Sequence, residues 1–275
     1  MDKVKITTCF HTHTARCGHA QGSDEQYVVS AIENEIETLG FSDHIMLPNI
    51  SEPGMRGEFH ELEDYLISIN ELKQKYADQI KIHVGFEAEF DEQFVGYYKK
   101  LLEEGKIEYL ILGQHSYYDP KLKRMVFYSN WASVDQRPAF KAYTDRVIEA
   151  MESGLFAYVC HPDLMMQVYP EFDSFAKKES ERIIDAAIKY DIPLELNLGG
   201  IRTGKRFGRT SNRYRYPVQE FWELVASKGA KVIIGIDAHA PKDFKYYRDF
   251  ELLKEVVGHL KFNLVNEIEL YSAKE

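Results

Sequence analysis

Hydrophobic and polar segments alternate along the chain in the order expected of an α/β protein. Short apolar runs, typical of buried strands, are separated by longer segments in which apolar residues recur every three or four positions, as on one face of a helix. The predicted strands are residues 4–10, 39–42, 80–86, 109–113, 156–160, 193–196 and 231–236. Because no linker interrupts this alternation, we expect one domain over residues 1–275, built of parallel strands joined by helices.

The predicted helices begin and end at recognisable residues. Ser23 and Gln26 have the spacing of a capping box that opens the first helix, and Gly40 is expected to stop it. Pro217 is expected at the first position of a later helix, which Gly229 closes. The other predicted helices are residues 59–76, 94–104, 140–153, 174–190 and 247–260.

The residues best suited to chemistry lie at or just beyond the C-terminal ends of the predicted strands. They are His11, His13, His44, Glu87, His115, His161, Asp237 and His239. In a barrel of parallel strands these ends converge on one face, where barrel enzymes place their active sites. The alternation therefore predicts an α/β fold with a closed or nearly closed, TIM-like barrel of seven strands. An open, doubly wound sheet is the alternative.

The segment from His11 to His19 indicates a metal site. His11 and His13 point the same way because side chains alternate along a strand, and His19 supplies a third imidazole. Imidazoles mixed with carboxylates suit Zn, Mn or Fe and are poor ligands for Ca or Mg alone. The strand ends offer too many ligands for one ion, so we expect two or three metals, with the two oxygens of Glu87 as the bridge. A polar loop that happens to be rich in histidine is the alternative interpretation.

Composition narrows the range of partners. The net charge of −10 disfavours a protein that binds long nucleic acid, because such binding needs a basic face, but it leaves a small anionic substrate possible. We find neither an apolar stretch of about 20 residues nor a signal-peptide pattern. Cys9, Cys17 and Cys160 lack CxxC spacing and are expected to be reduced thiols. We therefore expect a cytoplasmic protein without a membrane partner.

Short motifs follow one another along nearly the whole chain. They are HTH (11–13), CGHA (17–20), FSDH (41–44), GFEAEF (85–90), GQHSY (113–117), CHPD (160–163), NLGGIR (197–202) and GIDAHA (235–240). In order and spacing they resemble the PHP (polymerase and histidinol phosphatase) family, and within it the stand-alone histidinol-phosphate phosphatases. The resemblance implies a distorted seven-stranded β/α barrel with a trinuclear metal centre.

The resemblance also divides the candidate ligands among three metals. The sets are His11, His13, Glu87 and Asp237; His19, His44 and His239; and Glu87, His115 and His161. It implies hydrolysis of L-histidinol phosphate to L-histidinol and phosphate, a step of histidine biosynthesis. Clustered divalent ions neutralise phosphate charge and lower the pKa of bound water towards about 7. We therefore expect a metal-bridging hydroxide to attack phosphorus in line.

Four further side chains are expected to assist this reaction. Asp237 and His239 are candidates for proton transfer to the leaving alkoxide. Asp43, beside His44, and Asp163, beside Pro162, are expected to orient the imidazoles.

Phosphate also requires cations. Arg202, at the end of the NLGGIR motif, matches the family's candidate for a bidentate phosphate contact, and Arg16 and Arg206 are further candidates. Two other functions stay open. The same site could act on another small phosphate ester, a nucleotide or a phosphodiester, or the chain could bind metal without turnover.

Overall fold

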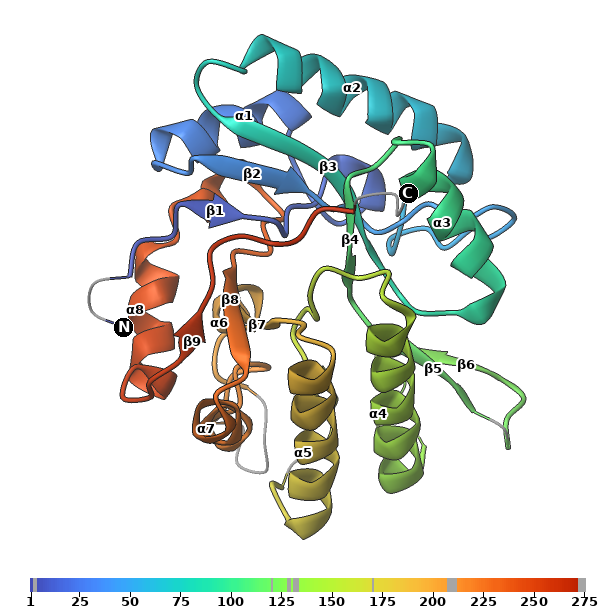
Figure 1. Cartoon of the computed structure of the whole chain (residues 1–275), viewed down its shortest axis with the longest axis vertical. Coiled ribbons are helices and arrows are strands. Elements are labelled where there is room, and N and C mark those ends of the chain that lie inside the picture. The colour runs from blue at the N-terminus through green and yellow to red at the C-terminus, as the bar shows by residue number, and fades with distance from the viewer. Residues whose placement is uncertain are drawn as a thin grey trace.

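The computed structural model describes residues 1, 4–119, 121–127, 130, 134–169, 171–206 and 212–271. Its strands lie near the centre of the molecule, with helices around them (Figure 1). Four parallel strands pair in chain order: β1 (Thr8–Cys9), β2 (Thr38–Phe41), β3 (Lys81–Ala88) and β4 (Tyr109–Leu112). A second parallel sheet contains β7 (Leu194–Asn197), β8 (Lys231–Gly235) and β9 (Asn263–Leu264).

Single backbone bridges join these sheets. Val159 bridges both Leu112, at the end of β4, and Leu194, at the start of β7. Thr12 and Ala238, which follow β1 and β8, form another bridge. The fold is therefore α/β with a curled, parallel half-barrel sheet. The strand predicted over 156–160 contributes only the bridge at Val159, so the structure does not confirm a complete ring of seven regular strands.

Helices cover the outer side of the sheet (Figure 1). They are α1 (Asp24–Glu33), α2 (Leu62–Lys75), α3 (Val95–Glu103), α4 (Gln136–Ser153), α5 (Ser174–Lys189), α6 (Gly199–Arg202), α7 (Gln219–Lys228) and α8 (Tyr247–Val257). Short 3₁₀ turns are η1 (Ala15–Cys17), η2 (Phe59–Glu61), η3 (Glu92–Phe94), η5 (Leu164–Gln167) and η6 (Pro241–Phe244).

The first helix opens where the sequence predicts and ends earlier. Ser23 Oγ accepts a hydrogen bond from Gln26 N (3.4 Å), and Ser23 N donates to Gln26 Oε1 (2.9 Å), which confirms the capping box. The helix stops after Glu33 because Glu35 adopts a left-handed φ of 62° and the chain then turns into β2. The predicted end at Gly40 was therefore wrong, since Gly40 lies inside a strand.

Two later segments also differ from expectation. Helix α7 begins at Gln219 rather than at Pro217, although Gly229 closes it as predicted. The aromatic connection after β4 contains an antiparallel hairpin, β5 (Ser116–Asp119) and β6 (Arg124–Phe127), which extends away from the main sheet (Figure 1).

A small apolar cluster fills the concave side of the sheet. It contains Phe10, Tyr109, Ile111, Tyr158, Cys160 and Ile233. The Tyr109 hydroxyl lies 3.0 Å from the carbonyl oxygens of both Phe10 and Phe41, so one buried phenol ties together β2, β4 and the segment after β1. This packing supports the strand ends that carry the predicted ligands.

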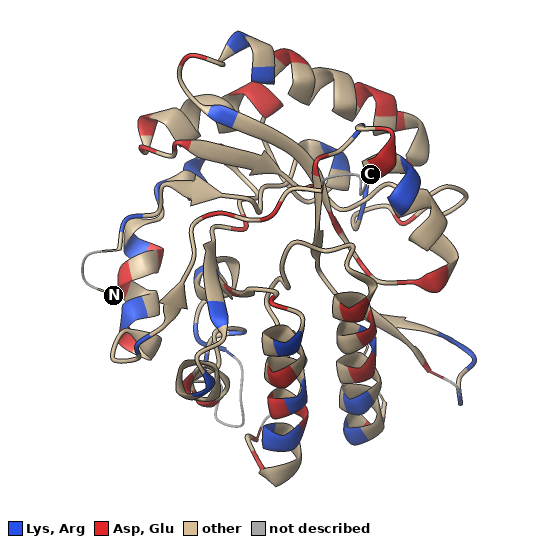
Figure 2. Cartoon of the chain, in the orientation of Figure 1, with Lys and Arg blue, Asp and Glu red and all other residues tan. Residues whose placement is uncertain are grey.

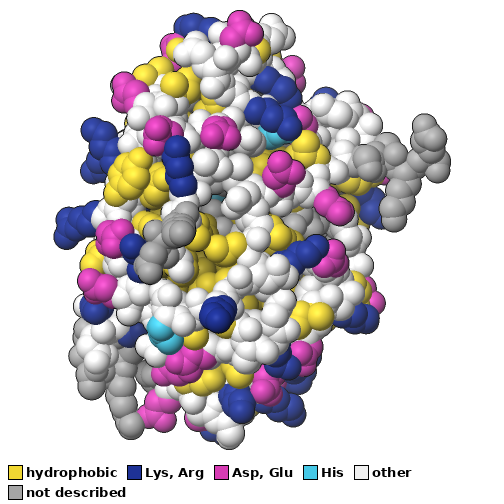
Figure 3. Space-filling view, turned by 60° about the vertical axis from the view of Figure 1, so that its left-hand side comes forward, with side chains coloured by type: hydrophobic (Ala, Val, Ile, Leu, Met, Phe, Trp, Pro, Cys, Tyr) yellow, Lys and Arg dark blue, Asp and Glu magenta, His cyan; other side chains and the backbone are white. Residues whose placement is uncertain are grey.

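The outer surface carries charges of both signs. Acidic and basic side chains alternate along α4 and α5 (Figure 2), and the face shown in Figure 3 likewise intersperses them. Cys9, Cys17 and Cys160 are buried free thiols, as predicted. Of the helices described, none has both the length and the apolar character needed to cross a membrane.

Glu108 stabilises the start of β4. Its carboxylate accepts hydrogen bonds from Lys73 Nζ (2.9 Å) and Val84 N (2.9 Å) and lies 3.1 Å from His83 Nδ1. Burial alone would raise the pKa of Glu108, but these partners lower it to about 2. An unfolded glutamate titrates near 4.3. The carboxylate therefore stabilises the fold fully above about pH 4.5, and this contribution is lost as the pH falls through about 2.

We expect Glu108→Gln to lower the free energy of unfolding at pH 7 by on the order of 1 kcal/mol, because the group is half-exposed and solvent screens it. The deficit relative to the unmodified chain should shrink steadily below pH 4.5. Urea unfolding at pH 7 and pH 3, in chelator, measures it. Glu104→Gln, which removes an exposed partner of Lys106, is the control. A deficit that does not change with pH would contradict this account.

Candidate metal centre

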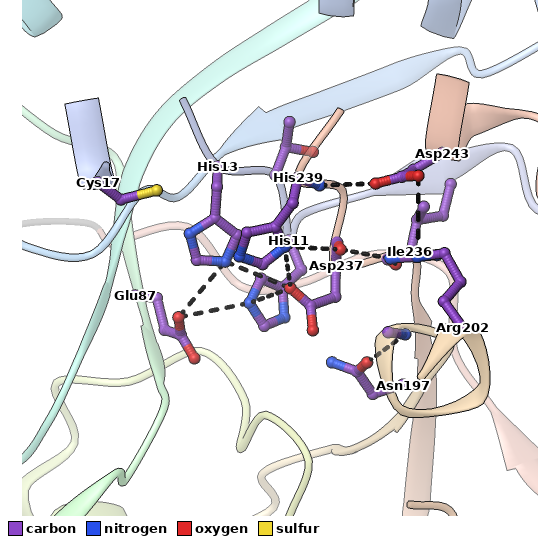
Figure 4. A network of polar contacts seen from close by, with 12 residues as sticks. His11, His13, Cys17, Glu87, Asn197, Arg202, Ile236, Asp237, His239 and Asp243 are labelled. Atoms are coloured by element: carbon purple, nitrogen blue, oxygen red, sulfur yellow. Dashed lines mark hydrogen bonds and ion pairs between the residues drawn. The ribbon is translucent and has the colours of Figure 1, made fainter. Parts of the chain in front are cut away.

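All of the predicted metal ligands gather at the C-terminal ends of the strands (Figure 4 draws part of the cluster). Within this cluster His19 is exposed, His239 is partly exposed and the other ligands are buried. Residues far apart in sequence thus meet on one face, as parallel strands predict. The structure shows this convergence even though the ring of strands is only partly regular.

The first predicted ligand set is compact. His11 Nε2 lies 3.5 Å from Asp237 Oδ1 and 3.6 Å from Glu87 Oε2. His13 Nε2 lies 3.3 Å and 3.6 Å from the same two oxygens. Two imidazole nitrogens therefore face two carboxylate oxygens around a common point, an arrangement that a divalent transition metal can occupy.

The second set lies at the rim. Ligand atoms of His13, His19, His44 and His239 fall within 4.8 Å of one another. The rings of His13 and His239 stack with centroids 4.0 Å apart. His13 thus lies beside both the first and the second set, whereas the sequence-based division assigned it to the first alone.

Glu87 lies between all three sets. Its Oε2 is 3.0 Å from His44 Nδ1 and also faces His11 and His13. Its Oε1 is 3.1 Å from His161 Nε2 and 3.5 Å from His115 Nε2. A Cβ built at Gly113 would lie 1.9 Å from Oε1, so only glycine leaves room for this carboxylate. The placement is that expected of a bridging ligand.

The surroundings set the charge of these groups. Burial raises the pKa of Glu87, but the imidazoles of His44, His115 and His11 outweigh it and hold the pKa well below its usual range. Burial lowers the pKa of His239 to about 3, with His13 adding to the effect, and burial likewise lowers that of His44. The cluster therefore offers an ionised carboxylate at Glu87 and neutral imidazoles at His44 and His239, the forms that bind metals. Nearby carboxylates instead raise the pKa of His11 and His13, so these two rings would release a proton on binding a metal.

Several ligand atoms point into the cluster without a hydrogen bond. Within the described part of the chain they include His11 Nε2, His44 Nδ1 and Asp237 Oδ1. Leaving buried polar atoms unpaired costs about 1–3 kcal/mol each. Divalent transition metals would satisfy these atoms, so the residues present fit such ions.

Carboxylates lie behind the imidazoles of His13 and His115. Asp43 Oδ1 is 3.4 Å from His13 Nδ1, which agrees with the orienting role expected of Asp43, and it also accepts from His44 N at 2.8 Å. Glu89 Oε1 lies 3.2 Å from His115 Nδ1. Such contacts fix which ring nitrogen carries the proton and which faces the metal.

Asp163 lies elsewhere. Its Oδ2 accepts hydrogen bonds from Val218 N (2.6 Å) and Trp222 Nε1 (3.1 Å), which ties the η5 turn to α7. No imidazole is among its described hydrogen-bond partners. The prediction that Asp163 orients His161 therefore receives no support from the geometry.

Arg202 turns toward the polypeptide rather than toward the cluster (Figure 4). Its guanidinium donates to the carbonyl oxygens of Ile236 and Asp237, and Nη1 lies 3.3 Å from Asp249 Oδ2. Asp243, 3.9 Å from Arg202 Nε, accepts from His239 N at 2.9 Å. These contacts clamp the segment that carries Asp237 and His239. A phosphate contact by Arg202 stays a prediction.

The other two arginines lie farther from the chemistry. Arg16 forms ion pairs with Asp24 (2.9 Å) and Asp64 (2.7 Å), so its charge is already balanced. Arg206 is exposed, and its backbone N–H donates to Arg213 O (3.0 Å). Neither arrangement supports the predicted phosphate contacts, because a phosphate would compete with carboxylates in the first case and with water in the second.

Sequence reasoning missed two buried acids beside the cluster, Glu89 and Glu195. Glu195, in β7, places Oε1 2.8 Å from His11 Nδ1. Its partner lies 184 residues away, so no local pattern reveals the contact. The available signal was a charged residue within an otherwise apolar strand, LELN.

Comparison with known proteins identifies the family of this chain. The model of the PHP domain family matches residues 10–198. A probable histidinol-phosphatase of Deinococcus radiodurans is 24% identical over 256 residues, covering 90% of this chain and 91% of that protein. A probable histidinol-phosphatase of Schizosaccharomyces pombe is 25% identical over 253 residues, covering 84% and 80% respectively.

Two solved structures share the fold. The putative histidinol phosphatase HisK of Listeria monocytogenes superposes with a TM-score of 0.71 at 19% identity, over 87% of this chain and 99% of that one. The HisK histidinol phosphate phosphatase of Lactococcus lactis, solved with zinc, L-histidinol and phosphate, gives 0.67 at 18% identity, over 94% and 95%. The family model covers more than half of the residues, and the chain belongs to the PHP domain family.

Proposed function

We propose that this chain is a metal-dependent phosphomonoesterase that hydrolyses L-histidinol phosphate to L-histidinol and phosphate. The observation that carries the proposal is the position of Glu87, whose two oxygens face five imidazoles from four segments of the chain. The choice of substrate is supported by the two relatives of nearly matching length, both named probable histidinol-phosphatases.

The predicted ligands would hold two or three divalent ions of Zn, Mn or Fe. The sets are His11, His13, Glu87 and Asp237; His19, His44 and His239; and Glu87, His115 and His161. When bound, such ions neutralise the charge of a phosphate ester and make a coordinated water more acidic.

Asp237 is proposed to carry the proton that the leaving alkoxide receives. Burial raises its pKa, but His11 and His13 outweigh that and hold the pKa well below its usual range, so the carboxylate enters the reaction ionised. An ionised Asp237 can first accept a proton and then deliver it to the leaving alkoxide. His239 stays the second candidate, since its ring nitrogen Nδ1 lies 3.3 Å from Asp237 Oδ1.

Three further proposals complete this picture. The seven-stranded barrel is supported by the bridges at Val159 and Thr12, which connect the two sheets. The series of strands and helices along the described residues supports one domain over residues 1–275. We also propose that the protein is cytoplasmic and that it acts on a small phosphorylated substrate rather than on long nucleic acid.

A substrate panel tests the function. After loading with Mn, Zn or Fe, phosphate release is measured on L-histidinol phosphate, p-nitrophenyl phosphate, nucleoside monophosphates, a phosphodiester and a phosphotyrosine peptide. We expect kcat/KM to favour L-histidinol phosphate at least tenfold, about 1.4 kcal/mol of discrimination. A smaller preference would favour a phosphoesterase for another small ester, nucleotide or phosphodiester. Release from none of them would indicate metal binding without turnover.

A further inference from the structure

We infer that Glu195 is a positioning residue that braces two of the metal-ligand sets against each other by holding His11 and the backbone of His161. The inference rests on the proposed metal centre and concerns how the chain keeps it assembled. Glu195 lies on β7 and contributes no atom to the three ligand sets. Its side chain is fully buried beneath the strand-end cluster.

Each oxygen of Glu195 serves a different element. Oε1 lies 2.8 Å from His11 Nδ1. Oε2 accepts hydrogen bonds from His161 N (3.1 Å) and from Asn197 Nδ2 (2.7 Å). One carboxylate thus joins the segment after β1 to the segment after Val159, and these segments carry ligands of the first and third sets.

The contact with His11 also decides which nitrogen of that ring faces the metals. Glu195 Oε1 lies at hydrogen-bonding distance from His11 Nδ1 and so favours the tautomer in which Nδ1 carries the hydrogen. Nε2 then turns its lone pair toward Asp237 Oδ1 and Glu87 Oε2. Without this acceptor, neither the tautomer nor the ring orientation of His11 would be fixed.

The contact with His161 fixes an unusual backbone. His161 has φ of 30°, a left-handed value that residues other than glycine rarely adopt. Its N–H donates to Glu195 Oε2, and its Nε2 lies 3.1 Å from Glu87 Oε1. Glu195 therefore holds the backbone in the conformation that brings this imidazole to Glu87.

The fold accommodates the buried carboxylate of Glu195 by placing a glycine beside it. A Cβ built at Gly235, on the neighbouring strand, would lie 1.8 Å from Glu195 Oε1. Among the residues the structure describes, no lysine or arginine forms an ion pair with Glu195. Burying such a carboxylate is costly unless its hydrogen bonds are excellent. Its contacts with two ligand-bearing residues give a reason for its presence.

Glu195→Gln tests the brace. The amide keeps the size but replaces one acceptor by an NH₂ group, which must face either the Nδ1–H of His11 or the N–H of His161. We expect metal affinity to fall about 10–100-fold at the ions bound by His11 and His161. The ion bound by His19, His44 and His239 should be retained. Metal per chain is measured against chelators of graded affinity, without substrate.

Glu179→Gln is the matched control. Glu179 is equally buried, on α5, and pairs with Arg182 at 2.6 Å, away from the predicted ligands. Unfolding of both variants in EDTA measures any loss of metal-free stability. Weaker metal binding by Glu195→Gln alone, with stability no lower than that of the control, supports the brace. Unchanged metal affinity, or a loss of stability with metal affinity intact, overturns it.

A variant with a shorter acidic side chain provides a second test. If Glu195→Gln does not fold, Glu195→Asp keeps the charge but draws the carboxylate back by one methylene, and the same loss of affinity is expected. Unaltered affinity in that variant would count against the brace. An unmodified chain that bound no metal would refute the proposed function itself, and the inference with it. Normal metal binding without turnover would refute only the proposed reaction.

Discussion

Replacing Glu87 by glutamine is expected to lower kcat for phosphate release about a thousandfold, ~4 kcal/mol of transition-state stabilisation. The glutamate presents one oxygen to His161 and His115 and the other to His44, His11 and His13. Glutamine has a single oxygen, so its NH₂ group would face imidazole nitrogens on one side or the other. The chain would then lose the one group that all three ligand sets share.

The measurement combines kcat at saturating substrate with the metal content of the purified protein. Glu92→Gln, an exposed change in η3 shortly after β3, is the control and should behave like the unmodified chain. A Glu87→Gln protein with full metal content and more than a tenth of the activity would show that this carboxylate does not bridge.

Asp237→Asn is expected to remove most turnover, with kcat reduced about a hundredfold or more. Asp237 Oδ1 lies 3.3 Å from His13 Nε2 and 3.5 Å from His11 Nε2, and the carboxylate is ionised. Asparagine keeps the shape of the side chain, but it carries no negative charge and cannot accept the proton that the reaction must move.

Measuring metal content distinguishes the two proposed roles of Asp237, proton transfer and metal binding. A protein that keeps its metals but loses turnover would support proton transfer, whereas joint loss of metals and turnover would show that the residue acts only as a ligand. Near-normal kcat with full metal content would refute both roles. Glu87→Gln and Asp237→Asn should also differ from Glu195→Gln, which changes the support of the ligands rather than the ligands themselves.

The convergence of the candidate ligands could be predicted because they occupy equivalent places in a repeated pattern. His44 and His161 each follow an apolar run, and the carboxyl ends of parallel strands meet on one face, so their convergence follows from the alternation alone. Glu87, which follows the 80–86 run, is the predicted bridge because a carboxylate has two oxygens. The structure places its two oxygens between the imidazoles as that reasoning requires.

Other features could not be predicted because they depend on distant partners. The sequence predicts a phosphate contact for Arg202, yet its guanidinium donates to carbonyl oxygens just after β8. Glu195 has its partner at the other end of the chain. Helix α1 ends early because pairing of β2 with β1 outweighs helix propensity at Leu39.

The clamp by Arg202 and Asp243 determines when, during synthesis of the chain, the predicted ligands can come together. His11 and His13 leave the ribosome early, but Asp237 and His239 belong to the last third of the chain and lie beyond the segment that matches the family model. The clamp that holds them also uses Asp249, in α8. All of the predicted ligands can therefore be held in place only after the segment through α8 has been synthesised and has docked.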